Sequence, residues 1–364
     1  MDPDDDGNAI LYLVDDIQDD DSDMDSVHTT TSGFTEHTMS TLTSAAASDY
    51  FQEVNGRMFP LDENLPFLFP TDQAEVRRLE FQHEALKLLL KGNYFGPVRE
   101  VLGDPQPDGK RKRVLDLITG EGSWVREMAV EFPHVDFTSV DNTPLVPHTR
   151  CTNILGYEVY DLYNGIAESD NTFDVVHLRH AMTKIRDLPG LVIEIHRVLK
   201  PGGLFLYGEF HNNGWDASTE DHAAEETAPY MIRALRIARD IFSSQGAYAY
   251  AWRDVPLLLE PCCVIWQSVH DLDEPQRGFT SIRLETKMAP AGVWHHSPRL
   301  REVGRLMQHT WVQTWTNLRP MYLNNGLSER ETDELIMGVQ RELLEPGSRK
   351  FYGKYTVLYA FKPL

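Results

Sequence analysis

The sequence predicts an α/β fold in which a mostly parallel sheet carries helices on both faces. Two observations lead to this prediction. Between Arg113 and Tyr207, short apolar runs alternate with segments whose apolar residues recur every three or four positions. The first of these runs also ends in a glycine-containing turn that opens a helical pattern. Because a helix between two strands returns the chain to the same end of the sheet, such strands pair in parallel.

Each element follows from its local pattern. Asp72 with Glu75 three positions later is typical of a helix start, and the apolar period continues to Gly92. Between residues 113 and 207 the pattern predicts strands over 114–117, 135–140, 157–160, 173–178 and 204–207. It predicts helices over 124–132 and 188–199. Further on, we expect helices around 231–242 and from 300, and strands at 264–269, 281–284 and 355–361.

The first 54 residues differ from the rest in composition. The 364-residue chain has a formal charge of −22, and residues 1–50 hold 13 acidic residues and no Lys or Arg. We expect residues 1–54 to form a disordered, acidic and Ser/Thr-rich tail, because such a segment buries too little surface to offset its ordering entropy. The apolar run 10–14 inside it is either a chance cluster or a strand that docks on a protein partner.

Several functional classes are disfavoured by composition. Outside the tail the charge is only about −9 and no basic face is evident, which argues against direct nucleic-acid binding. The one basic run, 110–113, is either a solvated loop or a nuclear import signal, so we expect a cytoplasmic protein with nuclear location as the alternative. No apolar run is long enough to predict a membrane span.

Metal and disulfide sites are not expected. The three cysteines are odd in number and two of them are adjacent, which favours a reducing compartment. The pair His295-His296 has no Cys or carboxylate at ligand spacing. We therefore predict no metal.

The strongest chemical signal is the turn after the first strand, Thr119-Gly120-Glu121-Gly122. Backbone N–H groups of such a turn can face a polar ligand, and Asp141, 21 residues after Gly120, can accept both hydroxyls of a ribose. A dinucleotide fingerprint would require glycine where Val125 stands, so NAD is disfavoured. S-adenosyl-L-methionine fits better, and a fold that retains an empty site is the remaining alternative.

The order of these motifs resembles the class I S-adenosylmethionine-dependent methyltransferases, and more narrowly the fungal LaeA-like group. The resemblance covers about residues 54–364 and rests on segments spread along the chain: 55–57, 82–83, 116–122, 141–144, 173–179, 199–203, 294–304 and 355–359. It implies a Rossmann-like, seven-stranded, mostly parallel sheet with an N-terminal helical cap and C-terminal lid elements. The expected domain, 55–364, comprises a cap (55–110), a cofactor-binding core (111–212), a substrate or lid region (213–345) and a final strand (346–364).

The resemblance also implies roles for individual residues. Asp116, Gly120 and Gly122 would border the methionine part of the cofactor, Asp141 the ribose and Asp161 the adenine. The full expected cofactor set is Asp116, Thr119, Gly120, Gly122, Asp141, Asn142, Asp161, Leu162, His177 and Arg179.

Ile118 departs from the family pattern, which has glycine there. A left-handed conformation would cost a branched residue about 1–2 kcal/mol. Either the residue keeps a negative φ and the cofactor shifts slightly, or binding is weak or lost.

The expected activity is methyl transfer to an unidentified acceptor, with a small metabolite as the first choice. Methyl transfer from a sulfonium needs alignment, and an oxygen acceptor also benefits from a base. The candidates for that base are His180, Glu209 and His211, and an amine acceptor can react without one.

Among the aromatic and Met residues at 294–322, we expect one or two to form a lid over the substrate and the others to pack in the core. The alternative function is a non-catalytic or weakly cofactor-binding regulator of secondary metabolism that acts through protein partners.

Overall fold

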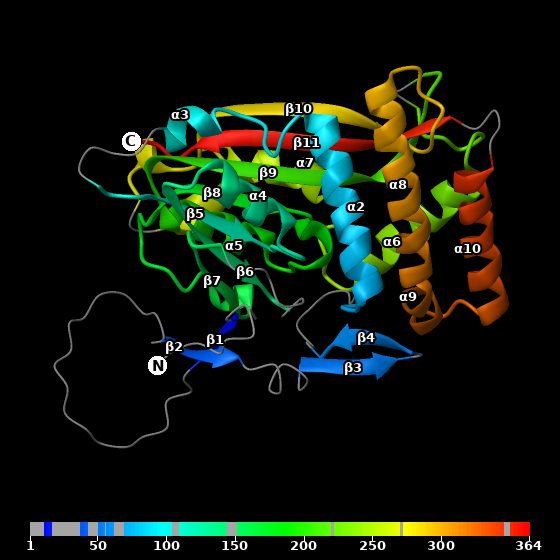
Figure 1. The fold of residues 1–364 in the computed structure, drawn as a ribbon, viewed down its shortest axis with the longest axis horizontal. Coiled ribbons are helices and arrows are strands. Elements are labelled where there is room, and N and C mark those ends of the chain that lie inside the picture. Colours follow the sequence, from blue (N-terminus) through cyan, green and yellow to red (C-terminus); the bar gives the residue numbers. More distant parts are fainter. Residues whose placement is uncertain are drawn as a thin grey trace.

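The computed structural model describes residues 11–16, 37–42, 50–54, 56–61, 69–103, 109–143, 151–219, 222–269, 272–345 and 350–364. Within them a nine-stranded sheet runs in the order β10-β11-β9-β8-β5-β6-β7-β1-β2, and β3 pairs with β4 in a separate hairpin (Figure 1). The strands are β1 (Leu11–Asp16), β2 (His37–Leu42), β3 (Phe51–Val54), β4 (Arg57–Pro60), β5 (Lys112–Leu117), β6 (Val135–Asp141), β7 (Ile154–Val159), β8 (Phe173–Arg179), β9 (Leu199–Asp216), β10 (Thr280–Pro290) and β11 (Phe351–Phe361).

The central strands confirm the predicted mostly parallel sheet. Strands β7, β6, β5, β8 and β9 pair in parallel, while β11 is antiparallel to both β9 and β10. Parallel pairing brings the carboxyl ends of β5, β6 and β8 to one edge, where ligands bind in open α/β sheets.

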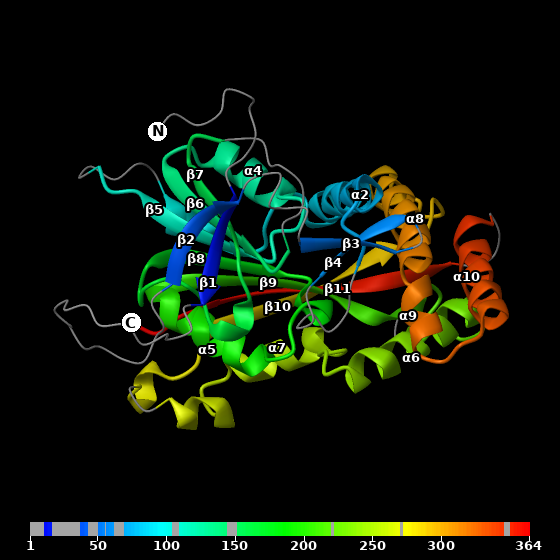
Figure 2. The same ribbon diagram turned by 90° about the horizontal axis from the view of Figure 1, so that it is seen from below.

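Helices cover both faces of the sheet (Figure 2). They are α2 (Gln73–Leu90), α3 (Val98–Leu102), α4 (Ser123–Glu131), α5 (Leu188–Val198), α6 (Pro229–Ser244), α7 (Ala251–Leu259), α8 (Pro298–Asn317), α9 (Arg319–Asn324) and α10 (Glu329–Leu344). Consecutive residues of a strand point to opposite faces. Val175 of β8 accordingly packs in the cluster that contains Trp124 of α4, and Val176 packs in the cluster that contains Ile195 of α5.

A further helical layer lies beside one end of the sheet. Helices α2 and α8 run next to each other there, with α6, α9 and α10 beyond them (Figure 1). Leu86 of α2 and Met307 of α8 pack with Tyr355 and Val357 of β11. This layer stands over the carboxyl ends of the parallel strands and bounds the site described below.

The predicted strand at 264–269 is wrong, because Val264–Ser268 is a short 3₁₀ helix. Trp266 at its centre is fully buried and donates its indole N–H to the carbonyl of Leu258. The apolar pattern of residues 264–269 does not distinguish a strand from a helix, because a run this short has no clear period of either kind. Helices α7, α9 and α10 were not anticipated.

Three segments within residues 1–54, which the sequence predicts to be a disordered tail, are described as strands. Leu11–Asp16 pairs in parallel with the outer edge of β7 and in antiparallel with His37–Leu42. Phe51–Val54 pairs with β4. The apolar run thus adds to this chain's own sheet edge, where its backbone groups find partners. The rest of the predicted tail lies outside the described residues, apart from Tyr50.

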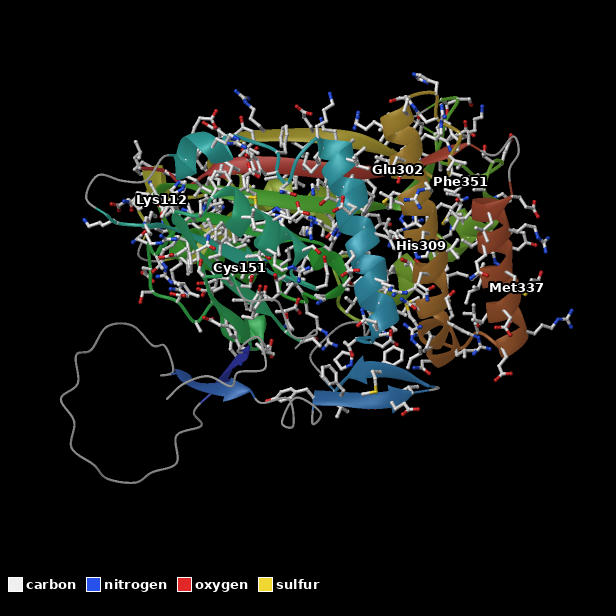
Figure 3. All side chains as sticks on the ribbon, viewed as in Figure 1. Lys112, Cys151, Glu302, His309, Met337 and Phe351 are labelled. Carbon is white, nitrogen blue, oxygen red and sulfur yellow. The ribbon has the colours of Figure 1, made fainter. Side chains whose placement is uncertain are left out.

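The basic run lies at the far end of the sheet from Phe351 and α10 (Figure 3). Arg111 pairs with Asp136, Lys112 lies 3.2 Å from Asp174, and Arg113 lies 3.1 Å from Glu168. No helix of the described chain combines the length and apolar character that a bilayer crossing requires.

Candidate active site

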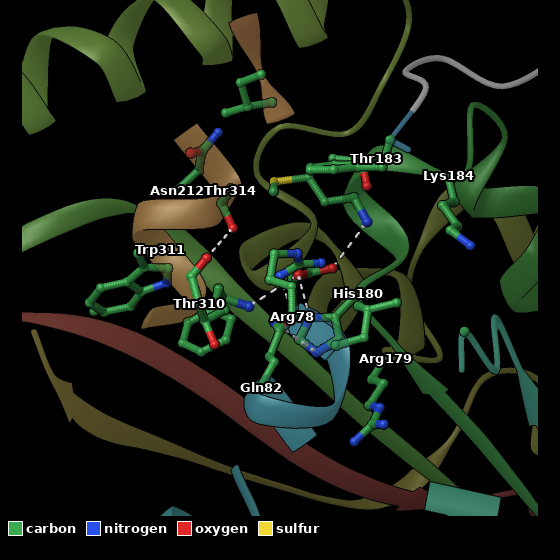
Figure 4. Close-up of a pocket in the computed structure, with 18 of the residues that line it drawn as sticks. Arg78, Gln82, Arg179, His180, Thr183, Lys184, Asn212, Thr310, Trp311 and Thr314 are labelled. Carbon is green, nitrogen blue, oxygen red and sulfur yellow. Dashed lines mark hydrogen bonds and ion pairs between the residues drawn. The ribbon is translucent and has the colours of Figure 1, made fainter. Parts of the chain in front are cut away.

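A cavity of about 250 Å³ opens where the carboxyl ends of β5, β8 and β9 meet helices α2, α6 and α8. Figure 4 shows Thr310 and Trp311 of α8 across the cavity from Thr183 and Lys184, which follow β8. Gly120 and Thr119 of the first turn contribute one part of the wall. The cavity therefore joins the predicted cofactor turn to the helical layer.

The glycine turn holds the carboxylate of Asp141. The backbone N–H of Gly120 donates to Asp141 Oδ2 at 2.9 Å, and that of Thr143 donates to Oδ1 at 3.2 Å. Lys184 Nζ donates to both oxygens, at 2.8 and 3.1 Å. Asp141 is 3 % exposed, so these donors compensate a buried charge.

Asp116, at the end of β5, belongs to a second buried network. Its Oδ2 accepts from the hydroxyl of Thr119 at 2.6 Å, and its Oδ1 lies 2.7 Å from His177 Nδ1. The His177 ring stacks on Trp124 with 3.7 Å between centroids. Burial lowers the pKa of His177, although the Asp116 carboxylate opposes this shift. A neutral ring that donates from Nδ1 is the assignment that satisfies Asp116.

Asn142, next to Asp141, has two buried polar side-chain atoms without a partner in the described part of the chain. Its side chain is 8 % exposed, and the two atoms are its amide nitrogen and its oxygen. Buried amides in proteins are normally hydrogen-bonded. A ligand with a hydrogen-bonding edge at the end of β6 would satisfy this group, which agrees with a nucleoside cofactor.

The predicted base candidates lie together on the opposite wall of the cavity. Glu209 is 2 % exposed and accepts backbone N–H groups of Met182 and Phe210, at 3.0 and 3.1 Å. His180 Nδ1 lies 3.7 Å from Glu209 Oε1, and burial lowers the pKa of His180. A neutral imidazole beside a carboxylate is suited to accept a proton.

Helix α2 extends this polar wall. Arg78 pairs with Glu75 at 2.7 Å and donates to Gln82 Oε1 at 2.9 Å, and Gln82 Nε2 lies 3.4 Å from His180 Nε2. Arg179 donates to His83 Nδ1 at 3.2 Å. Burial and Arg179 lower the pKa of His83 to about 3, so the His83 ring is neutral.

His211, the third base candidate, lies on the cavity wall with its ring stacked on Trp252. Its Nε2 lies 2.7 Å from Thr356 Oγ1, while Nδ1 is buried without a partner in the described part of the chain. Burial, together with repulsion from Lys354, lowers the pKa of His211 to about 4.

The remaining wall is apolar and comes from α6 and α8. Trp311 and Trp315 line the cavity, and the lid role expected of one or two residues in this region stays a prediction. Tyr322 and Met321 pack in the core of the helical layer, and Met307 packs between α2 and β11. Residues that recur with the same helical period on α8 therefore either line the cavity or pack in the core.

The structure brings some of the predicted site residues to the cavity and leaves others behind it. Thr119, Gly120, Arg179, His180, Glu209 and His211 line the cavity, whereas Asp116, Gly122, Asp141, Asn142, Asp161, Leu162 and His177 do not. Asp116 and His177 form the buried network described above. Gly122 caps α4, Asp161 follows β7, and the Leu162 side chain packs in the core.

Sequence reasoning missed Lys184 and Arg78 as members of the site. Both are single charged residues outside any motif, so no local signal marked them. Gln82 belongs to a segment that carries the family resemblance, but the resemblance implies no role for it.

Ile118 adopts the conformation that its side chain disfavours. Its φ is +59°, and its side chain is 6 % exposed, within the core beneath the turn. The first of the two alternatives, a negative φ, is therefore wrong. The left-handed backbone costs about 1–2 kcal/mol for a residue with a Cβ, and burial of the side chain offsets that cost.

This conformation predicts an inverted order of stability. Ile118→Gly and Ile118→Ala both lose a buried side chain, but only glycine also relieves the left-handed strain. We expect Ile118→Gly to be more stable than Ile118→Ala by about 1 kcal/mol in urea unfolding. The matched pair Ile195→Gly and Ile195→Ala, in helix α5, should show the usual order with alanine more stable. Alanine more stable at both positions would mean that residue 118 does not hold a positive φ in solution.

Comparison with known proteins agrees with this architecture. Residues 86–252 match a family model described as a methyltransferase domain. The chain is 28 % identical over 305 residues to the secondary metabolism regulator laeA of Coprinopsis cinerea, covering 82 % of this chain and 71 % of the relative. It is 25 % identical over 256 residues to the protein-methionine methyltransferase laeA of Emericella nidulans, covering 70 % of this chain and 61 % of the relative.

Among solved structures, a phosphoethanolamine N-methyltransferase 2 of Haemonchus contortus in complex with S-adenosyl-L-methionine matches with a TM-score of 0.41 and 17 % identity, covering 88 % of this chain and 73 % of that one. The sequence match to the Emericella relative covers 61 % of that protein, which is less than two thirds of its length. The family model and the two sequence relatives are all of the kind that the order of motifs along the sequence predicts. Residues 86–252 are therefore similar to a methyltransferase domain, and most of the chain is similar to fungal LaeA proteins.

Proposed function

We propose that this protein is an S-adenosyl-L-methionine-dependent methyltransferase whose acceptor is a small, largely apolar molecule. The observation that carries the proposal is the continuity of one cavity from the Gly120 turn to the Glu209–His180 pair. One end is formed by Thr119, Gly120 and Lys184, which contact the nucleoside candidates behind the wall, and the other offers a proton acceptor beside an apolar wall.

The cofactor would be held at the carboxyl ends of β5 and β6. Asp141 would accept the ribose hydroxyls, Asn142 would satisfy its orphaned amide on the cofactor, and the turn at Gly120 would border the methionine part. Asp161, after β7, remains the candidate for the adenine edge. When bound, the cofactor supplies an electrophilic methyl group on a sulfonium.

The protein's own residues would align the acceptor and remove its proton. Trp311, Trp315 and Phe242 would exclude water and hold an apolar body, which leaves a nucleophilic heteroatom at the polar end. Glu209 or the neutral His180 would take the proton of an oxygen acceptor. His211, on the same wall, is the third candidate.

A second candidate function is a regulatory protein that binds the cofactor weakly. The Lys184 contact on Asp141 favours it, because the ammonium occupies the carboxylate assigned to the ribose. Ile118, where the family pattern has glycine, is the second departure at this turn. The Coprinopsis relative also carries the name of a secondary metabolism regulator. In this case the acidic N-terminal segment would dock on a protein partner, and nuclear rather than cytoplasmic location would follow from such a role.

Titration calorimetry with S-adenosylhomocysteine separates these functions. We expect saturable heat with a dissociation constant in the micromolar range. No heat at high micromolar ligand would overturn the enzyme proposal.

A second measurement identifies the class of acceptor. The protein is incubated with methyl-labelled S-adenosyl-L-methionine and its mass is then measured. Addition of a methyl group to the protein itself would point to a protein side chain as acceptor, such as the methionine named for the Emericella relative. An unmodified protein that binds S-adenosylhomocysteine agrees with a small-molecule acceptor.

A further inference from the structure

We propose that Lys184 sets the affinity for the cofactor by competing with it for Asp141. This inference rests on the proposed function, because it concerns the carboxylate assigned to the ribose. Lys184 was not among the predicted site residues. Its ammonium lies 2.8 Å from Oδ1 and 3.1 Å from Oδ2 of Asp141, so it contacts both oxygens at once.

The contact leaves little acceptor capacity on Asp141. Each carboxylate oxygen already accepts one backbone N–H, from Gly120 or from Thr143. A ribose diol binds through two hydroxyl donors, and these need the two oxygens that the ammonium now contacts. The ammonium and the diol are therefore alternatives at this carboxylate.

Lys184 is placed so that it can move away. It follows the short 3₁₀ segment Ala181–Thr183, its side chain is 21 % exposed, and it lines the cavity. The backbone of this segment is held by Glu209, which accepts the N–H of Met182 at 3.0 Å. Release of Asp141 thus requires rotation of a flexible, partly exposed side chain and no movement of the strand ends.

A thermodynamic cycle gives the direction of the effect. In the ligand-free protein the ammonium compensates a buried carboxylate, and that stabilisation is lost when the cofactor displaces it. Removing the ammonium destabilises the free protein but not the complex. Loss of Lys184 should therefore strengthen cofactor binding, whereas loss of a lysine that merely supports the site would weaken it.

The test uses the full chain and S-adenosylhomocysteine in titration calorimetry. Lys184→Met keeps the side-chain length without the charge, and Lys184→Arg keeps the charge. We expect Lys184→Met to bind about tenfold more tightly than the natural protein and Lys184→Arg to bind about equally. Lys184→Gln serves as a second uncharged variant if Lys184→Met does not fold.

Thermal unfolding provides an independent readout. Lys184→Met should unfold at a lower temperature than the natural protein without ligand, and ligand should raise that temperature by more than it does for the natural protein. Equal or weaker binding by the uncharged variants, with a natural protein that binds, would overturn the competition and leave the proposed function intact. No binding by any variant would overturn both. Binding by the uncharged variants alone would be the strongest support for the competition.

Discussion

Asp141→Asn should bind S-adenosylhomocysteine about 100-fold more weakly than the natural protein. A hydrogen bond to a charged group contributes about 1.5–3 kcal/mol, and the substitution removes the charge and turns one acceptor into a donor. The amide keeps one acceptor oxygen for the N–H of either Gly120 or Thr143, so urea unfolding of the same variant separates the loss of ligand binding from any loss of stability.

Calorimetry of three variants checks this expectation. Asp170→Asn, which changes a 65 % exposed carboxylate far from the cavity, is the matched control and should bind as the natural protein does. The double variant Asp141→Asn with Lys184→Met should show no gain over Asp141→Asn alone, because the two residues act through one contact. Affinity of Asp141→Asn within threefold of the natural protein would remove Asp141 from the cofactor site.

Asp116→Ala should lower the free energy of unfolding by about 3 kcal/mol, because it leaves the buried His177 donor without an acceptor and removes the shorter of two contacts of the Thr119 hydroxyl. The Nδ1 of buried His177 depends on this carboxylate, and the hydroxyl of Thr119 would keep only Ser139 Oγ, 3.2 Å away. Asp116→Asn keeps one acceptor oxygen and should lose about half as much.

Urea unfolding of the ligand-free protein measures this loss. Asp170→Ala removes an exposed partner of Arg197 and should cost less than about 1 kcal/mol. Equal losses for Asp116→Ala and Asp170→Ala would mean that the Asp116 network contributes no more than a surface ion pair. The family resemblance assigns Asp116 to the cofactor, and the network explains why a carboxylate is needed there even without ligand.

Part of this site could be predicted because parallel strands end together. Gly120 and Asp141 are 21 residues apart and meet at 2.9 Å, since β5 and β6 are neighbours and each residue follows or ends its strand. Asp116 and His177 occupy directly paired positions on β5 and β8. Strand order and strand ends suffice to bring these residues together.

Other contacts had no local signal. Lys184 reaches Asp141 from the segment after β8, and Asn317 of α8 donates to Glu75 of α2 across 242 positions of sequence. An amphipathic period shows that Trp311 and Met307 lie on a buried face, but it does not show which of them borders a cavity. The position at which α8 packs against the sheet decides which of these residues borders the cavity.

The sequence alone determined the parallel sheet, the position of the glycine turn and the acids at the ends of β5 and β6, because period, turn residues and spacing are local properties. Tertiary structure decided the conformation of Ile118, the contact of Lys184 with Asp141 and the apolar wall of α6 and α8. These depend on which distant side chains share a small volume, where burial and charge compensation outweigh local preference. Whether the turn binds its cofactor strongly or weakly depends on this second set.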